Sequence, residues 1–451
     1  MPQTQKRNQL CPISVFLGFN QTDNGKYPVF VRNTCFFLIN HSSEITYGTF
    51  TNTSRHLFSQ MPLAKINFRF IFKAMFTASK PDTFEKLQIL SKDSQYDLAC
   101  ACGSDKSEHR TQGSKGKWIY PVTLPGGGVS NLFKILISNH CSSDCKYCPL
   151  NNNSDTQRCQ LDNNELINAF LDYYRRGEVF GIFLSSGVIG NADRTMEKLT
   201  ACAEILRNKH NFKGYIHLKI IPGSSPAAIE KAISLSNAVS LNIETPGKEF
   251  LEKLSIKKDF LKDIVEPMKL ISKLTAESQK RVKQTTQFIV GAAGESDRQI
   301  VNYTQALYER LNMGRVYFSA YQPPVQNNPQ SFIREHRLYQ VDFLFRKYGF
   351  NSSDIFYDND GRLSIDTDPK ELWAKNHPEA FPVNINTATR YNLLRVPGLG
   401  HITVEKILQM RKSAKLTSID DIGKVDVRLK KADKYLEFAG AAKNKMYLFN
   451  F

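Results

Sequence analysis

The sequence predicts an α/β protein in which an open, partial (βα)6 barrel is followed by a small all-α domain. Three observations support this. Six strand-like runs alternate with six helical segments along the centre of the 451-residue chain, as in a parallel sheet with right-handed crossovers. Six units are fewer than the eight of a closed barrel. After the last unit, the pattern changes to short helices separated by glycine-rich turns.

The composition excludes several classes of protein. Hydrophobic residues make up 41% of the chain and charged residues 23%, which is enough apolar material for a core and rules out a wholly disordered chain. No run approaches the roughly 20 apolar residues that cross a bilayer, so we expect no membrane partner. Nine cysteines are too sparse for a disulfide scaffold. Three of them are clustered, which predicts a metal in a reducing compartment and hence a cytoplasmic protein.

The chain divides into five segments. The first is acid-poor and rich in Phe, Asn and Thr, and it lacks the features of a secretory signal. Two interpretations of it stay open: it belongs to the protein, or Met75 is the true start. The expected segments are an N-terminal extension of doubtful structure (1–74), a lead-in (75–130), the partial barrel (131–350), a connector (351–383) and a C-terminal helical domain (384–451).

Each element follows from its local pattern. Apolar residues at Phe84, Leu87, Ile89 and Leu90 predict a short amphipathic helix beginning after Asp82. The strand-like runs are 133–138, 180–186, 215–221, 238–244, 286–292 and 315–321. The helical segments lie near 162–176, 193–209, 226–236, 259–274, 297–311 and 332–348.

A cysteine run directly after the first strand is the most specific motif. It reads Cys141-Ser-Ser-Asp-Cys145-Lys-Tyr-Cys148-Pro, so three thiolates on one loop can converge on a single centre. Three ligands are too few for a closed zinc site, but they suit a cubane iron–sulfur cluster whose fourth iron stays open. A zinc site with His140 or Cys159 as fourth ligand is the alternative.

Strand alternation predicts a polar barrel lumen. His217 and Lys219 share one face of the third strand, and Asn242 and Glu244 share one face of the fourth. Such a lining suits an open barrel that holds a charged cofactor and a polar substrate, whereas closed barrels pack apolar residues inside. His217 and Lys219 are the candidate catalytic residues, because either can handle a proton or hold an anion. The alternative is that these side chains face solvent at strand ends.

The C-terminal segment is basic. Residues 384–451 carry 13 basic and 6 acidic side chains, a net +7, whereas the longer segment 75–383 carries only +4. Thr387 is the expected N-cap of a first helix, and Pro397-Gly398-Leu-Gly400 forms a tight turn before a helix over 402–412. Glycines allow close backbone approach, and a helix N-terminus presents free N–H groups to an anion.

This segment resembles a helix-hairpin-helix, which holds the nucleic-acid backbone without reading sequence. A weaker copy follows over 416–438. A small helical protein-interaction domain is the alternative. The candidate DNA-binding residues are Pro397, Gly398, Gly400, His401, Lys406, Arg411 and Lys412.

The cysteine run after the first of six βα units also resembles the signature of the radical S-adenosylmethionine (SAM) superfamily. The resemblance implies a [4Fe-4S] cluster on Cys141, Cys145 and Cys148, with SAM bound at its unique iron and cleaved by one electron to a 5′-deoxyadenosyl radical. It places further cofactor contacts at Ser185, Ser186, Gly187, Asn242, Glu244, Gly291 and Glu295. The turn at Gly187 lacks the acidic residue of the family's Gly-Gly-Glu pattern, so only a backbone role carries over.

Both motifs together resemble the DNA modification/repair radical SAM proteins over about residues 82–412. The resemblance implies an enzyme that modifies or repairs nucleic acid, DNA in particular. It also implies a DNA-glycosylase-like partner and an electron donor such as flavodoxin or ferredoxin. Two alternatives remain: a radical SAM enzyme acting on RNA, and a non-catalytic DNA-binding iron–sulfur protein.

Overall fold

The computed structural model describes residues 27–31, 35–39, 45–49, 81–94, 119–123, 128–321 and 329–440. The chain forms two compact units, Met1–Ser79 and Lys80–Phe451. The first contains a three-stranded antiparallel sheet that the sequence did not predict. Its strands are β1 (Tyr27–Val31), β2 (Cys35–Ile39) and β3 (Ile45–Thr49).

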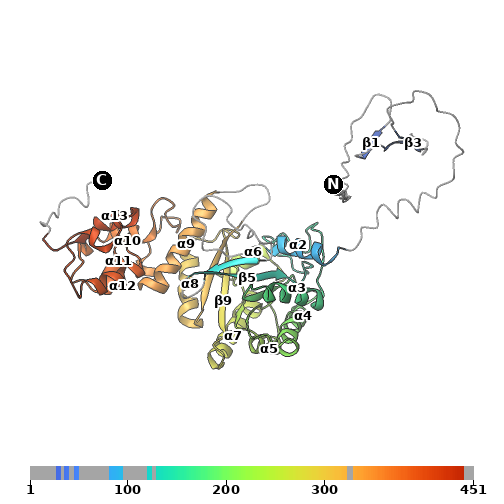
Figure 1. The fold of residues 1–451 in the computed structure, drawn as a ribbon, viewed down its shortest axis with the longest axis horizontal. Helices are drawn as coiled ribbons and strands as arrows, with labels where there is room; N and C mark the ends of the chain where they lie inside the picture. Colours follow the sequence, from blue (N-terminus) through green and yellow to red (C-terminus); the bar gives the residue numbers. More distant parts are fainter. Residues whose placement is uncertain are drawn as a thin grey trace, which may run out of the picture. The chain divides into compact units, whose positions relative to one another are not determined.

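The second unit is built on a seven-stranded sheet, in which Figure 1 labels β5 and β9. The order of its strands is β10-β9-β8-β7-β6-β5-β4. Six neighbouring strands run parallel, and β4 (Ile119–Thr123) pairs antiparallel with β5 at one edge. The two edge strands do not pair with each other, so the expected open barrel of six βα units is confirmed. The parallel strands are β5 (Val129–Leu136), β6 (Gly181–Ser185), β7 (Tyr215–Lys219), β8 (Ala238–Ser240), β9 (Lys283–Val290) and β10 (Arg315–Ala320).

A helix follows each parallel strand, as predicted. Several of these helices begin at a polar N-cap whose side chain accepts backbone N–H groups, as Asp162, Asn191 and Ser296 do. Short π-helical turns at Ile205–Lys209 and Phe260–Val265 complete two of the predicted segments. The helices are α3 (Asn163–Arg175), α4 (Ala192–Glu204), α5 (Pro226–Leu235), α7 (Glu266–Glu277), α8 (Asp297–Leu311) and α9 (Pro329–Tyr348).

Strand alternation separates the core from the lumen. On β5, Phe133 and Ile135 are fully buried, and the Phe133 ring packs edge-on against Phe170 of α3 at 5.7 Å. On β7, Ile216 and Leu218 are fully buried, while the residues between them are partly exposed. The apolar face therefore meets the helices, and the opposite face lines the lumen. The predicted helix after Asp82 is also present, as α2 (Thr83–Asp93).

The fourth strand is shorter than predicted. We expected it over 238–244, but β8 ends at Ser240, and only one isolated bridge, Glu244 with Phe288, continues the pairing. The chain then forms α6 (Lys248–Leu254), which the sequence did not predict. Asn242 and Glu244 therefore lie on the segment after the strand.

The C-terminal segment is largely helical, as expected, but it has one short sheet. The connector contributes α10 (Pro369–Asn376), and β11 (Val383–Asn384) pairs in parallel with β12 (Leu436–Glu437). The second, weaker hairpin starts with a 3-10 turn, Ile419–Ile422. The other helices of the C-terminal segment are α11 (Arg390–Arg395), α12 (His401–Met410) and α13 (Val427–Asp433).

The predicted helix cap at Thr387 is wrong. Thr389 caps α11, because its hydroxyl accepts the N–H of Asn392 at 3.2 Å. The backbone N–H of Thr387 points back to the Asn384 carboxamide oxygen at 3.2 Å. Thr387 thus belongs to a turn that precedes the helix. Both positions carry threonine, so composition alone could not separate them.

The C-terminal helices pack directly against the barrel. One apolar cluster runs from β5 through α9 to Leu393, Val404 and Ile407 without interruption. The buried Arg395 pairs with Asp354 at 3.0 Å and lies over the Phe350 ring at 3.8 Å. The described part of the predicted segment, residues 384–440, is therefore docked on the rest of this unit. No helix in the described ranges is both long and apolar enough to cross a membrane.

Candidate functional site

The three cysteines of the motif gather on the loop after β5. Burial raises the pKa of the Cys145 thiol, and Lys258, Glu244 and Cys141 are among its charged neighbours. Burial raises the pKa of Cys148 to about 12, and both other cysteines of the motif add to the rise. The three thiols thus lie close enough to repel one another as thiolates. A positively charged metal centre would relieve that repulsion, because coordination keeps thiols deprotonated.

The arrangement does not favour a single metal ion. In the described part of the chain, no three His, Cys, Asp or Glu side chains are grouped tightly enough to hold one ion. Tetrahedral zinc needs sulphurs about 4 Å apart, given Zn–S bonds of about 2.3 Å. Cys159, which with His140 is one of two alternatives for a fourth zinc ligand, has Asp93, Lys86 and Glu165 as its charged neighbours. In a cubane each cysteine binds a different iron, so its thiolates are spread more widely than the ligands of a single ion, and the looser grouping of these thiols suits a cubane.

Arg158 holds the cysteine loop in shape. Its guanidinium donates to the backbone oxygens of Asn139 at 2.5 Å, Leu150 at 2.9 Å and Asn151 at 2.7 Å. These carbonyl groups lie in loops, outside the helices and strands, and Arg158 supplies their hydrogen-bond donors. The sequence analysis missed this residue, since an isolated arginine 10 residues after the motif has no distinctive spacing.

A second segment clamps the loop from the other side. We call residues 253–258, which comprise the end of α6 and the turn after it, the clamp segment. Its Ser255 hydroxyl and the Ile256 N–H both donate to the Asp144 carboxylate, the latter at 2.9 Å. Its Lys257 Nζ donates to the Ser142 oxygen at 2.7 Å. Two further bonds run from Lys146 to the backbone oxygens of Lys253 and Leu254.

The turn after β6 packs against the same loop. A Cβ added at Gly187 would lie 2.3 Å from the His140 oxygen, so only glycine fits there. The Gly187 N–H donates to the Ser138 oxygen at 2.8 Å, and the Val188 N–H donates to Cys141 Sγ at 3.4 Å. The turn therefore supports the cysteine ligands directly. The resemblance assigns this turn a backbone role toward the cofactor, and the Gly187 N–H is already engaged within the protein.

The other two residues predicted in this turn are also tied to the first strand. The Ser185 oxygen accepts the Ile137 N–H at 2.8 Å, which continues the ladder between β5 and β6. The Ser186 hydroxyl donates to the Ser138 oxygen at 3.4 Å. Both residues position the turn beside the cysteine loop.

His217 and Lys219 face the lumen, as predicted. Lys134, Phe183 and His217 are register neighbours on three adjacent strands and therefore share a face. The His217 ring stacks on Phe183 with a centroid distance of 4.2 Å, and Lys134 Nζ lies 4.7 Å from the centre of the Phe183 ring. The sequence analysis missed Lys134 and Phe183, although the alternation of β5 and β6 places both on the lumen face.

The polar residues after β8 form a chain of contacts into the lumen. Lys219 Nζ donates to Asn242 Oδ1 at 2.6 Å, and Asn242 Nδ2 lies 3.5 Å from Glu244 Oε2. Glu244 also pairs with Lys258, with Nζ 3.7 Å from Oε1. The structure thus brings together Lys219, Asn242 and Glu244, and connects them to the clamp segment and the cysteine loop.

Glu295 lies at the base of the loop after β9. It is fully buried, and its two carboxylate oxygens accept the N–H groups of Gly291 and of Ala293, the latter at 3.1 Å. Arg334 Nη2 donates to the Glu295 backbone oxygen at 2.8 Å. Gly291 has φ +89° and turns the chain here. These residues fix the loop after β9, so any influence on a cofactor acts through the shape of that loop.

The lumen has unsatisfied polar atoms that suit a polar ligand. Within the described residues, Ser240 Oγ and Gln287 Nε2 are buried and have no hydrogen-bond partner in the protein. Ser240 is in register with Lys219, and Gln287 lies two residues beyond the register partner of Ser240. Buried polar atoms are nearly always paired. Their position beside the lumen residues fits a bound cofactor such as SAM.

The predicted DNA-binding residues divide into two groups, and four of them are engaged within the protein. Pro397 is buried. Lys406 Nζ donates to the Ile422 oxygen at 2.6 Å, and Arg411 donates to the Ala388 oxygen at 2.7 Å. Lys412 donates to the Gln409 side chain at 3.2 Å. Sequence reasoning counted these charges without their carbonyl and amide partners.

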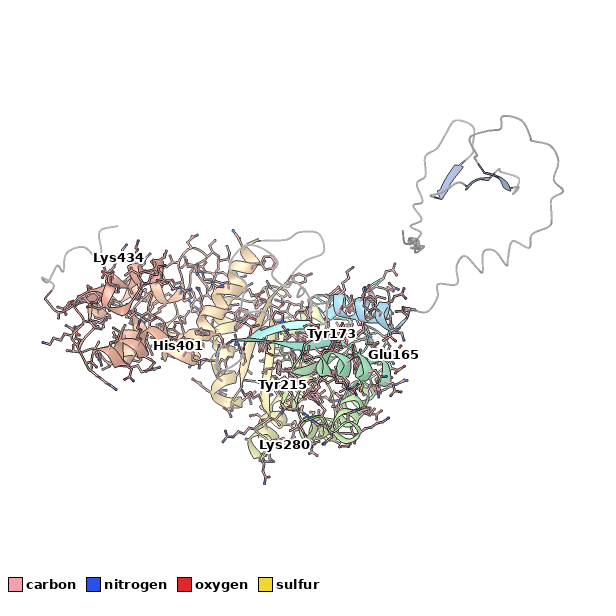
Figure 2. All side chains as sticks on the ribbon, in the orientation of Figure 1. Glu165, Tyr173, Tyr215, Lys280, His401 and Lys434 are labelled. Carbon is pink, nitrogen blue, oxygen red and sulfur yellow. The ribbon has the colours of Figure 1, made fainter. Side chains whose placement is uncertain are left out.

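The remaining three, Gly398, Gly400 and His401, line a groove of about 890 Å³ between α9 and the C-terminal hairpins. Gly400 is the N-cap of α12 and offers no side-chain cap. Figure 2 labels His401 at this position, and its ring lies 6.4 Å from that of Tyr348 on α9. The other ionisable residues of the groove are Arg315, His336, Asp368, Lys370, Asp426, Arg428 and Lys431.

Comparison with known proteins places the barrel in a family. Residues 135–307 match the family model described as the radical SAM superfamily. No curated protein matches the chain. Two solved structures give weak matches with a TM-score of 0.38 and 16% identity. The hydrogenase maturase HydG of Carboxydothermus hydrogenoformans matches over 48% of this chain and 52% of its own, and methylornithine synthase (PylB) over 47% and 62%.

These structural matches are too weak to carry an argument, and this chain covers between about half and under two thirds of each protein's length. The family match runs from the last two residues of β5 to Leu307 in α8, the part that bears the cysteine loop and most of the lumen. Residues 135–307 are therefore a radical SAM superfamily domain, whose cofactors are a [4Fe-4S] cluster and SAM.

Proposed function

We propose that this chain is a radical SAM enzyme that modifies or repairs nucleic acid, with DNA as the substrate. The observation that supports the nucleic-acid part is the groove beside α9. Residues of both hairpins, 398–403 and 426–429, line it together. Two backbone turns facing one groove suit a phosphate backbone, which is bound without reading sequence.

The two hairpins contribute unequally to this proposal. Asp426 caps α13 with its own carboxylate, which accepts the N–H groups of Arg428 and Leu429 at 3.0 and 2.9 Å. A carboxylate at that position repels a phosphate. The N-terminus of α12 has only Gly400 as its cap. Phosphate contact therefore belongs at α12, with the exposed Arg428 adding charge from the facing hairpin.

The barrel residues supply the reaction centre. Cys141, Cys145 and Cys148 hold the cluster, which on reduction allows one-electron cleavage of SAM. Ser240 and Gln287 offer polar atoms to the cofactor or substrate from the lumen wall. His217 and Lys219 line the same lumen and are placed to hold an anionic group or move a proton.

We further propose a cytoplasmic location, a flavodoxin- or ferredoxin-like donor, and docking of a DNA-glycosylase-like protein.

Binding measurements on the full chain test the nucleic-acid proposal. Fluorescence anisotropy with a labelled DNA duplex should show that Arg428→Glu weakens binding, by roughly tenfold if one phosphate contact of about 1.4 kcal/mol is lost. Lys434→Glu changes net charge equally on the exposed end of α13, and Figure 2 shows Lys434 well apart from His401. That control should bind nearly as the parent does. Equal losses in both variants would contradict binding in the groove.

Two further measurements separate the alternatives. A matched RNA duplex that binds more tightly than DNA would favour the RNA-modifying enzyme. Production of 5′-deoxyadenosine by the reduced, reconstituted protein tests catalysis. No SAM cleavage with a full cluster would favour a non-catalytic iron–sulfur protein. Nucleoside mass spectrometry after incubation with DNA would then identify the modified base or sugar.

A further inference from the structure

Lys258 is a nearly buried lysine at the end of the clamp segment. Its side chain is only 11% exposed, whereas the neighbouring Lys257 is exposed. A buried ammonium is costly unless it is paired. The free-energy cost of burying its ammonium must therefore be offset by specific partners, and these are residues of the cysteine site.

Two of these partners lie beside the cluster. Lys258 Nζ lies 3.7 Å from Glu244 Oε1, and Glu244 itself is 7% exposed in its side chain. The Nζ group also contacts the thiol of Cys145, which is 5% exposed. Lys258 therefore bridges a cluster ligand and a carboxylate in a site with little water.

The clamp holds this lysine in place. Residues on both sides of it are tied down: Ile256 to Asp144, Lys257 to Ser142, and the Asp259 carboxylate to the N–H groups of Leu261 and Lys262. These bonds fix the backbone on both sides of Lys258 beside the cysteine loop. The ammonium is held at Cys145 by its own contacts with that thiol and with Glu244.

A fixed cation at a cluster ligand affects electron uptake. One-electron reduction makes the cluster more negative, and hydrogen bonds and net charge around the sulphurs set the reduction potential. A nearby ammonium stabilises the reduced state more than the oxidised state. The Val188 N–H on Cys141 Sγ, at 3.4 Å, acts in the same direction. The Glu244 carboxylate opposes it.

We propose that Lys258 is a positioning residue that raises the reduction potential of the [4Fe-4S] cluster through Cys145, and that Glu244 limits the rise. The electron comes from a low-potential one-electron donor, and the cluster takes it up without a change in its ligands. This inference does not depend on the substrate, because it concerns the cluster before any substrate binds.

Potentiometric titration of the reconstituted full chain tests the proposal. The anaerobic protein is titrated with dithionite in the absence of SAM, and the reduced cluster is followed by electron paramagnetic resonance. Iron and sulphide analysis first establishes full loading. Lys258→Met should shift the midpoint potential to more negative values, and Lys258→Arg should restore most of it. Glu244→Gln should shift it to more positive values.

Lys262→Met is the matched control. Lys262 is exposed and four residues along the chain, so its loss removes one positive charge without touching the cluster site. Its midpoint should stay at the parent value. An unchanged midpoint in Lys258→Met, or an equal shift in the control, would overturn the proposal.

Two other outcomes are decisive. If Lys258→Met lowers SAM affinity but leaves the SAM-free midpoint unchanged, Lys258 serves SAM and the proposal fails. If Lys258→Met does not hold a cluster, the midpoint potential of Glu244→Gln tests the proposal in its place. A positive shift in that variant supports the inference, and no shift rejects it.

Discussion

The chemistry of the site depends on a few residues whose roles follow from what they touch. The three motif cysteines could be identified from sequence because their spacing is local and does not depend on the fold. Lys134, Phe183 and Lys258 were missed because each acts through partners far along the chain. Lys406 was misjudged for the opposite reason: it looks free in sequence, yet its ammonium binds a carbonyl.

The first residue-scale prediction concerns the cluster ligands. Cys145→Ala should abolish both the cluster and SAM cleavage, because two thiolates from the loop cannot hold a cubane with an open iron. Iron content, the visible absorption of the cluster and 5′-deoxyadenosine production measure this. Cys202→Ala is the control, since Cys202 is a fully buried core residue of α4. Full cleavage by Cys145→Ala would contradict the assignment.

Gly187 provides a second residue-scale prediction. Gly187→Ala would place a methyl group 2.3 Å from the His140 oxygen and 3.2 Å from Cys141 Cβ. The loop must shift, and overpacking of this kind costs about 1–3 kcal/mol. We expect a lower iron content per chain. Ser186→Ala in the same turn loses only a 3.4 Å hydrogen bond and should load normally. Normal loading of both variants would show that the turn does not support the cluster.

At the scale of elements, the alternation of strands and helices was predictable and the connections were not. Each predicted βα unit is present because its period and caps are local properties. The short β8 and the helix α6 were not foreseen. Both depend on how the chain after Ser240 reaches back to clamp the cysteine loop, which is a tertiary requirement. The second hairpin begins with a 3-10 turn for which its sequence gave no separate indication.

The two glycines of the first hairpin turn, Gly398 and Gly400, differ in how closely they are packed. Gly398 has φ +88°, and an added Cβ would lie 2.2 Å from the Arg428 oxygen. Gly398→Ala should therefore lower the thermal unfolding midpoint as well as DNA binding. Gly400→Ala meets only the Tyr348 hydroxyl, at 3.8 Å, and should leave the midpoint almost unchanged. Equal midpoints for the two variants would show that the first hairpin does not need this packing.

The contact between α10 and the first hairpin predicts a pH dependence. Burial lowers the pKa of Lys370 to about 7, and its Nζ donates to the Leu399 oxygen at 2.7 Å. In the unfolded chain, lysine stays protonated to about pH 10.4. Between these values the unfolded state binds more protons, so the free energy of unfolding rises with pH. The slope is at most about 1.4 kcal/mol per pH unit from this group.

Denaturant unfolding from pH 6 to 10 checks this dependence. Lys370→Met should remove the rise of the free energy of unfolding above pH 7. The variant also loses a hydrogen bond worth about 1 kcal/mol. Lys375→Met, on the exposed face of the same helix, should keep the rise. If the parent and Lys370→Met show parallel pH profiles, Lys370 is not a buried neutral amine.

At the scale of the whole second unit, the barrel and the C-terminal helices share one core. The sequence suggested a separate basic domain over residues 384–451. The structure instead continues the apolar cluster of α9 into Leu393 and Val396, and Arg395 is inserted between Asp354 and the Phe350 ring. Sequence patterns give the helices but not the surface on which they dock. That surface decides whether a part of the chain folds alone.

Truncation after residue 383 should therefore destabilise the barrel, rather than remove DNA binding alone. Deletion exposes apolar side chains of α9 and leaves Asp354 without Arg395, and truncating a largely buried ion pair commonly costs about 3–5 kcal/mol. We expect a lower thermal midpoint, more binding of a hydrophobic dye and a lower yield of loaded cluster. A truncated protein with the parent midpoint would show an independent module.

DNA affinity is then best assigned in the full chain, where binding through the groove should fall steeply with salt because phosphate contacts release counterions. Arg428→Glu should flatten that dependence, since one fewer phosphate is neutralised, and Lys434→Glu should preserve it.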